Sequence, residues 1–492
     1  MGIVHATDEA SKKSLRDQLR RTLSNRPSRL DMFSSRGRRK GKQPSVHEIA
    51  PDTGSRYVPR EYFILTDAGK PVFTSRPGGE DSDNMASTIG IMQALISVFI
   101  DDGDKIRCIN AGSTRITFAL RAPLYYACVS SWGEPESVAR SHLDYLHLQI
   151  ISIVTAAQLR RVFERRTNFD LRRLLNGSET FLTSLLSRLE LDLAMSTSSL
   201  HCLRLEAVIR KRAAEALLPQ SKMKDILYVL LVARGRVITI VRPKKHSIHP
   251  ADIHLLLNTI HAPSILNSPA SASWLPVCLP KFNPSGFVNA YISFPRKDDG
   301  LEAEQPDEQI PQPRYTSHAL DSGIGLVCIS GGGDFETIRT WCDSVTERME
   351  SDGTLDNIAN AFRSGHTEYS VSELGIPGLR HFLYKSRAQV QITCPTFEDP
   401  YSNIDERRRL TTLYQILHDA IHAKSGQEAT LKLQYIRSEK ESVMGWITQP
   451  FELYITLSPR LPKSAAVGAA NAVARWVKKE ESRLFLRDAP VF

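Results

Sequence analysis

The amino-acid sequence predicts an α+β protein in which one structural plan occurs three times. Each copy opens with two short apolar segments around a turn, which is the pattern of a β-hairpin. A helix, three strands and a further helix follow each hairpin. The hairpins start near residues 62, 226 and 381, so the copies lie 164 and 155 residues apart. A recurring order of elements at a nearly constant spacing is typical of repeated domains.

The first copy shows the plan most clearly. Asp67 and Gly69 mark the turn of its hairpin, because both residue types favour tight turns. The segment from Ile91 to Ile100 is predicted to be helical. We expect strands at 62–66, 71–74, 105–110, 114–121 and 124–132, a helix at 136–154, and more helix to about residue 190.

The second and third copies repeat this order with different residues. Helical spacing of Ile253, Leu256, Leu257 and Ile260 predicts the helix that follows the second hairpin. The second copy is expected to contain strands at 225–232, 236–241, 274–279, 287–294 and 324–329, with helices at 250–261 and 334–349. The third is expected to contain strands at 381–385, 389–393, 431–436, 443–447 and 453–457, with helices at 405–423 and 465–484.

These copies give the predicted domain boundaries. A tail at 1–56 precedes domains at 57–200, 201–352 and 353–492. A segment at 296–313, rich in Asp, Glu, Gln and Pro, is predicted to be a flexible loop within the second domain.

The helix at 91–100 has almost no polar face. Met85, Ile89, Met92, Ile96 and Phe99 form one apolar stripe, which a helix packed on a sheet requires. A second stripe lies roughly opposite and consists of Ile91, Leu95 and Val98. The helix is too short to cross a bilayer, which takes about 20 apolar residues. We interpret the second stripe as a surface for another protein, with burial inside the domain as the alternative.

Acidic residues follow this helix directly. The run Asp101-Asp102-Gly103-Asp104 resembles part of a calcium loop but lacks the later ligands. A turn that ends the helix explains the run better. Asp101 and Asp102 would then face a basic patch on a docked protein.

The charge of the chain is concentrated at one end. Residues 1–60 hold 14 Lys and Arg against 6 Asp and Glu, which accounts for +8 of the total of +9. The remaining body is therefore nearly neutral, which argues against a nucleic-acid-binding surface. The tail has few large apolar residues and is expected to be disordered. Its densest cationic cluster contains Arg36, Arg38, Arg39, Lys40 and Lys42.

This cationic cluster has three interpretations. A solvated tail is the simplest. Contact with an anionic membrane is the second, because each basic residue near such a surface contributes about 1 kcal/mol. Nuclear localisation or RNA contact is the third.

The sequence contains no recognisable catalytic or metal motif. It lacks a phosphate-binding P-loop, the zinc-protease pattern, the nucleophile elbow and the kinase signatures. Ser330-Gly-Gly-Gly-Asp334 precedes a predicted helix and could bind an anion through its backbone N–H groups, but a plain strand-to-helix turn is the favoured interpretation. The histidines are scattered, and no two cysteines have a C-x-x-C spacing, so we expect neither a metal site nor a cofactor. No apolar signal core follows Met1, and the apolar settings of the cysteines indicate a reducing cytosol.

Trp274 opens a predicted strand of the second copy. Packing in the core of the sheet is the simpler interpretation, and an exposed aromatic anchor for another protein is the alternative. The loop that begins at Lys281 is expected to lie near it.

Several segments resemble one known family. The segment YFILTDAGKPVFTSR at 62–76 resembles the opening hairpin of the SAND family, the monensin-sensitivity proteins of vacuolar fusion. DKIRCINAG at 104–112 and LYYACVSSWGEP at 124–135 resemble the segments that follow it. LPKFNPSGFVNAYISF at 279–294 and QITCP at 391–395 extend the resemblance into the other two copies.

The resemblance implies three longin domains, each a five-stranded antiparallel sheet flanked by helices. It also implies an obligate heterodimer with a second tri-longin protein, the calcium–caffeine–zinc sensitivity protein. Together the two chains would exchange guanine nucleotide on a late-endosomal Rab GTPase of the Rab-seven subfamily, with no covalent chemistry of their own. The first domains would supply the platform for the Rab, which gives a use to Ile91, Leu95, Val98, Asp101 and Asp102.

The resemblance further implies recruitment from the cytosol to late endosomes and vacuoles. An early-endosomal Rab would act upstream, and Trp274 and Lys281 are the candidate contacts. Anionic lipids or phosphoinositides would suit the tail. The rival hypothesis is a tether or adaptor that binds a GTP-loaded Rab without exchanging its nucleotide.

Overall fold

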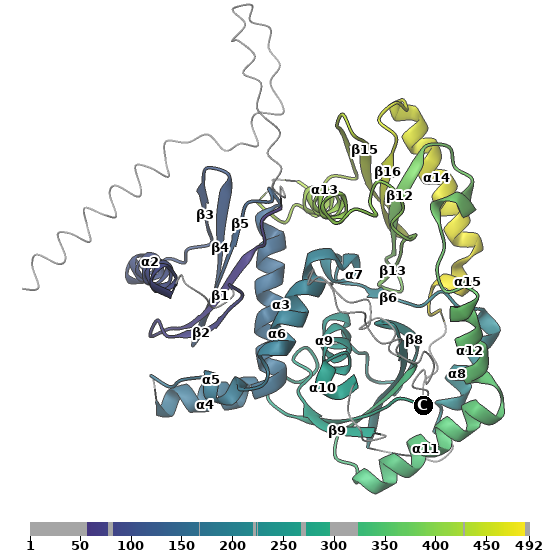
Figure 1. Ribbon diagram of the computed structural model, residues 1–492, viewed down its shortest axis with the longest axis horizontal. Helices are drawn as coiled ribbons and strands as arrows, with labels where there is room; N and C mark the ends of the chain where they lie inside the picture. The colour runs from purple at the N-terminus through teal and green to yellow at the C-terminus, as the bar shows by residue number, and fades with distance from the viewer. Residues whose placement is uncertain are drawn as a thin grey trace, which may run out of the picture. The chain divides into compact units, whose positions relative to one another are not determined.

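The computed structural model describes residues 57–76, 82–166, 168–219, 223, 225–266, 272–295, 323–426 and 429–487. The predicted α+β class is confirmed, because the described chain forms three separate sheets with helices packed on them (Figure 1). The predicted basic tail and the predicted loop at 296–313 lie outside the described residues. No helix in the described ranges combines the length and hydropathy that crossing a bilayer requires.

The first sheet has the strand order β2-β1-β5-β4-β3. Its core lies against α3, whose buried residues Leu143, Leu146 and Ile150 contact the apolar side chains of β1 and β5. The strands are β1 (Glu61–Thr66), β2 (Pro71–Thr74), β3 (Cys108–Ala111), β4 (Thr114–Arg121) and β5 (Leu124–Ser130). The helices that follow are α3 (Glu136–Val154), α4 (Ala156–Arg165), α5 (Arg172–Leu175), α6 (Glu179–Leu191) and α7 (Leu193–Ser196).

The second sheet has the order β8-β7-β11-β10-β9 and a core on each face. Helix α9 covers one face, and α8, α11 and α12 cover the other. Its strands are β7 (Ile226–Ala233), β8 (Arg236–Val241), β9 (Ala272–Val277), β10 (Val288–Ser293) and β11 (Gly325–Ser330). Its helices are α8 (Ala207–Ala216), α9 (Pro250–Ile260), α10 (Pro263–Leu266), α11 (Phe335–Ser351) and α12 (Thr354–Arg363).

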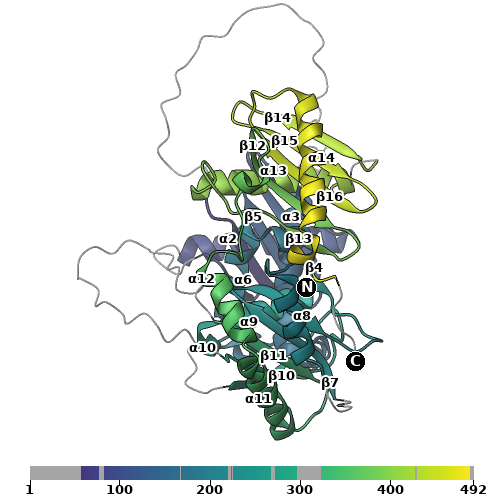
Figure 2. The same ribbon diagram turned by 90° about the vertical axis from the view of Figure 1, so that its right-hand side faces the viewer.

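The third sheet has the order β14-β15-β16-β12-β13-β6. Helix α13 packs on one face and α14 on the other (Figure 2). A 3₁₀ helix, η3 (Val371–Leu374), precedes the third sheet along the chain. The five longer strands of the sheet are β12 (Leu379–Ser386), β13 (Gln391–Thr393), β14 (Leu433–Arg437), β15 (Ser442–Ile447) and β16 (Phe451–Leu457). Its helices are α13 (Ile404–His422), α14 (Lys463–Lys479) and α15 (Glu481–Leu484).

The three sheets share one topology. In each, the opening hairpin forms one side, the last strand pairs with the first, and the remaining two strands follow outward. This common order supports the repeated plan that the spacing of hairpins predicts.

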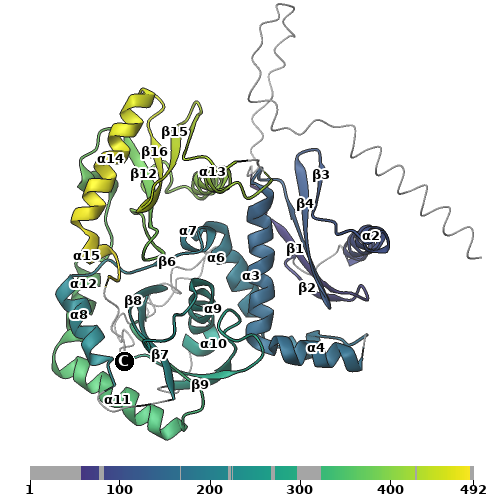
Figure 3. The same ribbon diagram turned by 180° about the vertical axis from the view of Figure 1, so that it is seen from behind.

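The third sheet differs from the predicted five strands. The two-residue strand β6 (Leu200–His201) pairs in parallel with Gln391 and Ile392 of β13. The next residue, Cys202, bridges to Val237 of β8 in the second sheet. Figure 3 shows β6 running between these two sheets. A two-residue strand has no measurable periodicity, so the sequence pattern could not reveal it.

The end of the chain also differs from the prediction of one helix at 465–484. The helix stops at Lys479, and α15 follows as a separate turn. The buried guanidinium of Arg210 on α8 binds this end. It donates to the carbonyl oxygens of Leu203 (2.5 Å), Phe485 (2.8 Å) and Arg483 (2.8 Å), and also to that of Ser482 (3.0 Å). One side chain therefore joins the first helix of the second domain to the last turn of the third.

Substituting Arg210→Met should destabilise the chain by about 3 kcal/mol, because several buried carbonyls lose a charged donor. Urea unfolding measures this change, and faster amide exchange over residues 482–486 locates it. Arg212→Met on the exposed side of the same helix is the matched control and should change little. Equal stability of the two variants would contradict the assigned role.

Candidate partner-binding surface

The predicted apolar helix is α2 (Ser82–Asp101). Met92 and Ile96 of the first stripe are buried, and Met85, Ile89 and Phe99 are partly buried. In the second stripe Ile91 is 59% exposed, and Leu95 and Val98 are partly exposed. The two stripes therefore differ at Ile91 on one side and at Met92 and Ile96 on the other, whereas their remaining residues are all partly buried.

Small residues surround Ile91 on the exposed surface. Ala86, Gly90 and Ala94 are exposed and follow one another at a spacing of four, so they share one side of the helix. Apart from the adjoining residues and the backbone of the helix itself, no atom of the described residues lies within 4 Å of the place where a Cβ of Gly90 would be. A backbone from another protein could approach this side closely, with Ile91 as the projecting apolar side chain.

The acidic run after α2 is a helix end, as predicted. Gly103 has a φ of +71°, a conformation that favours glycine. Its N–H donates to the Ile100 carbonyl oxygen (2.9 Å), and the N–H of Asp104 donates to that of Phe99 (2.9 Å). This is the Schellman arrangement of a helix C-terminus. Asp101 and Asp102 are both exposed there.

Trp274 is partly buried in β9. Its ring packs edge-on against Phe335, with centroids 5.4 Å apart, and lies near Tyr291 at 6.5 Å. It belongs to the core on the α11 face of the second sheet. The ring is therefore used in packing, and the residue as a whole is only partly buried.

The loop at Lys281 is held by a buried carboxylate. The backbone N–H groups of Lys281 and Phe282 each donate to Asp252 of α9 at 3.0 Å. Burial raises the pKa of Asp252 to about 6, although these hydrogen bonds oppose the rise. The Phe282 ring packs on the α9 face of the sheet. The structure thus places Trp274 and this loop against cores on different faces.

The cationic cluster of Arg36, Arg38, Arg39, Lys40 and Lys42 lies outside the described residues. Its predicted contact with membranes stays a prediction.

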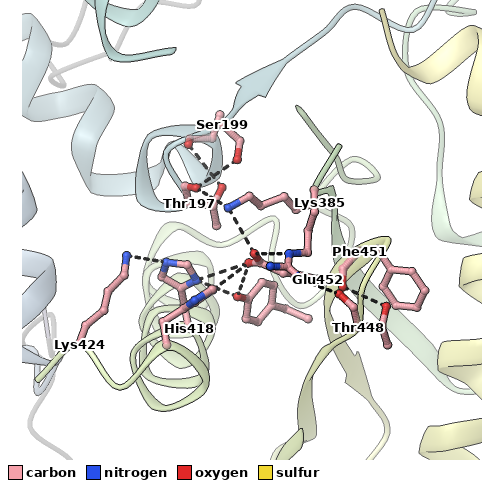
Figure 4. A network of polar contacts seen from close by, with 12 residues as sticks. Thr197, Ser199, Lys385, His418, Lys424, Thr448, Phe451 and Glu452 are labelled. Carbon is pink, nitrogen blue, oxygen red and sulfur yellow. Dashed lines mark hydrogen bonds and ion pairs between the residues drawn. The ribbon is translucent and has the colours of Figure 1, made fainter. Parts of the chain in front are cut away.

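A buried polar network in the third domain was not predicted. Glu452 of β16 accepts from His422 at 3.0 Å and from the Tyr454 hydroxyl at 3.2 Å, and forms an ion pair with Lys385 at 3.4 Å (Figure 4). Burial opposes the charge on Glu452, but His422 and Lys385 hold the pKa of this carboxyl below its ordinary value. Lys385 also donates to the Thr197 carbonyl oxygen (3.0 Å), which attaches the network to the segment between the first two domains.

The network continues through His418 to Lys424. The Lys424 ammonium donates to Nε2 of His418 (3.0 Å), so Nδ1 carries the hydrogen that points to the Tyr454 hydroxyl (2.7 Å). Burial lowers the pKa of His418 well below its ordinary value, and burial also lowers that of Lys424.

Two histidines and a carboxylate at this distance could in principle bind a divalent cation. Ligand atoms of His418, His422 and Glu452 lie within 4.8 Å of one another. Lys424 occupies one His418 nitrogen and Lys385 neutralises Glu452, so a metal ion would face two ammonium groups. We therefore assign the group as a network of hydrogen bonds and ion pairs. The sequence signal that could have found it is the spacing of four between the histidines on the predicted helix.

The fold defines the class of this protein. It is a tri-longin chain, and models of the first, second and third longin domains of FUZ, MON1 and HPS1 match residues 60–185, 224–346 and 378–481. The particular family follows from more similar relatives. The vacuolar fusion protein MON1 of Cryptococcus neoformans is 51% identical over 440 residues, which cover 89% of this chain and 66% of that protein.

Animal relatives agree with this assignment. The MON1 homolog A of Gallus gallus is 36% identical over 87% of this chain and 72% of its own length. Protein SAND of Takifugu rubripes is 34% identical over 87% of this chain and 76% of its own length. The chain belongs to the MON1/SAND family of vacuolar fusion proteins, as the sequence motifs predict, and it spans about two thirds of the length of the Cryptococcus relative.

Buried neutral histidines predict acid lability. Burial lowers the pKa of His254 to about 4 and that of His381 to about 3, against about 6.5 in an unfolded chain. Below pH 6.5 the unfolded state binds more protons, so the free energy of unfolding should fall as the pH decreases from about 6.5 to about 4. Each such histidine contributes up to about 1.4 kcal/mol per pH unit, which urea unfolding at several pH values measures.

The control for this prediction is His254→Gln. Nε2 of His254 bonds to the Ser199 carbonyl oxygen (2.8 Å), and a glutamine amide keeps a donor there without titrating. Its unfolding free energy should depend less steeply on pH than that of the parent. An identical slope in the two proteins would show that His254 does not titrate as expected.

Proposed function

We propose that this chain is a subunit of a heterodimeric guanine nucleotide exchange factor. Its substrate would be a late-endosomal or vacuolar Rab GTPase of the Rab-seven subfamily, and its partner the second tri-longin protein. The complex would promote endosome maturation and vacuole fusion. The family's established role in vacuolar fusion supports the cellular setting of this proposal.

The exposed side of α2 is the observation that carries the proposal. Ile91 is more than half exposed although the apolar residues of the same helix at Met92 and Ile96 are buried. Leaving a large apolar side chain in water forgoes roughly 1.5–3 kcal/mol of burial. A binding partner explains why the chain keeps it there.

The two aspartates at the end of α2 point to a cationic partner surface. Acidic groups at a helix C-terminus face the negative end of the helix dipole, which costs about 0.3–1 kcal/mol for each. Asp101, the last residue of the helix, is therefore not placed for the stability of α2. Lys or Arg side chains on a docked protein would offset this cost and orient the apolar contact.

Exchange needs no covalent step in this mechanism. A GTPase holds its nucleotide through phosphate contacts and Mg²⁺. A protein that binds the nucleotide-free form best weakens nucleotide affinity by the same factor, because the two equilibria are linked. Release speeds up, and the GTP excess in the cell reloads the site. Ile91, Leu95, Val98, Asp101 and Asp102 are the proposed contacts for the Rab or the partner chain.

Release of a labelled nucleotide from the Rab separates this proposal from its rival. The two-chain complex should accelerate release, whereas a tether or adaptor that binds the GTP-loaded Rab would leave the rate unchanged. The assay uses the full complex, because the single chain alone is expected to lack a complete platform.

Ile91→Asp and Leu95→Asp should each abolish exchange or partner assembly, because a carboxylate would be buried without a counter-charge. The chain should remain soluble, since neither side chain is fully buried. Release of labelled nucleotide and co-purification of the partner are measured together. Val208→Asp is the matched control, because Val208 is 63% exposed on α8, and it should keep full activity. Intact exchange in both α2 variants would contradict the proposed platform.

Recruitment involves separate surfaces in this proposal. Trp274 and Lys281 are the proposed contacts for an early-endosomal Rab, supported by the partial exposure of Trp274 and by the exposed Lys281 side chain. The cationic cluster at 36–42 is proposed to contact anionic lipids or phosphoinositides.

Deleting residues 1–56 should leave exchange in solution unchanged and reduce recruitment to acidic liposomes. The reason is that the deletion removes most of the net positive charge and none of the described fold. Flotation with vesicles of increasing phosphatidylserine content measures recruitment. Equal flotation of both proteins at every composition would remove the tail from membrane binding.

A further inference from the structure

Four sheet edges in the described ranges have no neighbouring strand. They are β2, β3, β9 and β14, since β6 covers β13 and Cys202 bridges to β8. Strands β2 and β3 contain four residues each, and β9 contains Pro276, which lacks an N–H. Of these free edges only β14 is both longer than four residues and free of proline. It is therefore the free edge best suited to pair with another strand.

The backbone of β14 offers its free groups at alternate residues. Ile447 donates to the Lys432 carbonyl oxygen (2.9 Å), and Ser438 donates to that of Glu441 (2.8 Å). In an antiparallel pair, every second residue of a strand forms backbone hydrogen bonds with the neighbouring strand. The N–H and C=O groups of the residues between them point away from that strand. The backbone groups of Lys432 and Ser438 face β15. The N–H and C=O groups of Leu433, Tyr435 and Arg437 therefore point outward.

Apolar surface lines this edge on the α14 side. Tyr435 packs partly against the core of that face, and Lys463 at the start of α14 lies 5.7 Å from its ring. Leu433 is 37% exposed and Val467, one turn further along α14, is 40% exposed. The strand edge and the helix thus present apolar contacts beside unpaired backbone groups.

The charges around β14 are mainly positive. Lys432, Arg437 and Lys463 are all exposed, and none has an ion pair with a described residue. Glu439 is the exposed acid in the adjoining turn, and Lys440 is paired with Glu406 at 2.5 Å. Charges on an edge strand alone would serve to prevent pairing. Here they flank exposed apolar residues, which favours selection of a partner of opposite charge.

We propose that the β14 edge binds an extended acidic peptide of a partner protein as an additional strand. The peptide would pair with the outward groups of Leu433, Tyr435 and Arg437. Its apolar side chains on the α14 face would contact Leu433 and Val467, and its carboxylates on the opposite face would meet Lys432. An acidic residue at the end of the peptide would meet Arg437 or Lys463. Strand addition of this kind obtains affinity from the backbone and selectivity from alternate side chains. The proposed peptide binding does not depend on nucleotide exchange.

The test uses a fluorescent nine-residue peptide in which valine or leucine alternates with aspartate or glutamate. Binding to the full chain is followed by fluorescence anisotropy. Tyr435→Pro removes one outward N–H and no bond to β15, so the fold should persist and affinity should fall at least tenfold. Lys432→Glu combined with Arg437→Glu should have the same effect, and Lys244→Glu in the second domain should have none.

Two further arms make the test decisive. A peptide of the same composition, with its acids in one block and its apolar residues in another, should bind at least tenfold more weakly. Thermal unfolding confirms that each variant is folded. No binding of the alternating peptide, equal binding of the two peptides, or full binding by Tyr435→Pro would overturn the proposal. The chain could instead bind phosphatidylserine vesicles and not the peptide, and only the charge variant could lose that binding. This result would assign the edge to a membrane and would also overturn the proposal.

Discussion

The arrangement of the second and third domains depends on one short segment, residues 192–203. Asp192 caps α7 by accepting from the N–H of Ala194 (2.8 Å). The carbonyl oxygen of Thr197 accepts from Lys385 of the third domain, and that of Ser199 from His254 of the second. Strand β6 then joins the third sheet and Cys202 the second. The N–H groups of residues 196–199 bond within the segment, but the carbonyl oxygens of Thr197 and Ser199 and the backbone of β6 find their partners in the two domains.

This constraint explains why so many buried groups are polar. His254, Lys385 and Arg210 all donate to main-chain carbonyl oxygens of this segment. A connecting segment that is buried between domains does not form a complete set of backbone hydrogen bonds of its own. Side chains therefore supply the donors that its carbonyl oxygens lack. Arginine and lysine are suited to this role, since they reach several acceptors from a distance. The cost is a set of buried titratable groups, of which the neutral His254 is expected to make the fold sensitive to acid.

Hydrophobic periodicity predicted most of the fold. Helix α3 and strands β4 and β8 begin and end where the pattern places them, because their apolar residues recur at the spacing that a helix or a strand requires. The pattern failed where stability comes from single long-range contacts. The strand β6 has two residues, and the pairing of His418 and His422 with Glu452 joins helix to strand across 30 residues or more. A charge or hydrogen bond between distant positions leaves no periodic trace in a single sequence.

The candidate surface shows the same division. The two stripes of α2 were predictable because helix geometry alone separates Ile91 from Met92 and Ile96. That Ile91 stays exposed could not be read from the pattern, since an apolar residue of either stripe could equally be buried. The small side chains at Ala86, Gly90 and Ala94 make the exposure informative, because they leave the backbone of α2 open to close approach. A helix that needed only its own domain would gain from replacing Gly90, because glycine is about 1 kcal/mol less favourable than alanine in a helix, and the open backbone kept at this position is what points to a second protein.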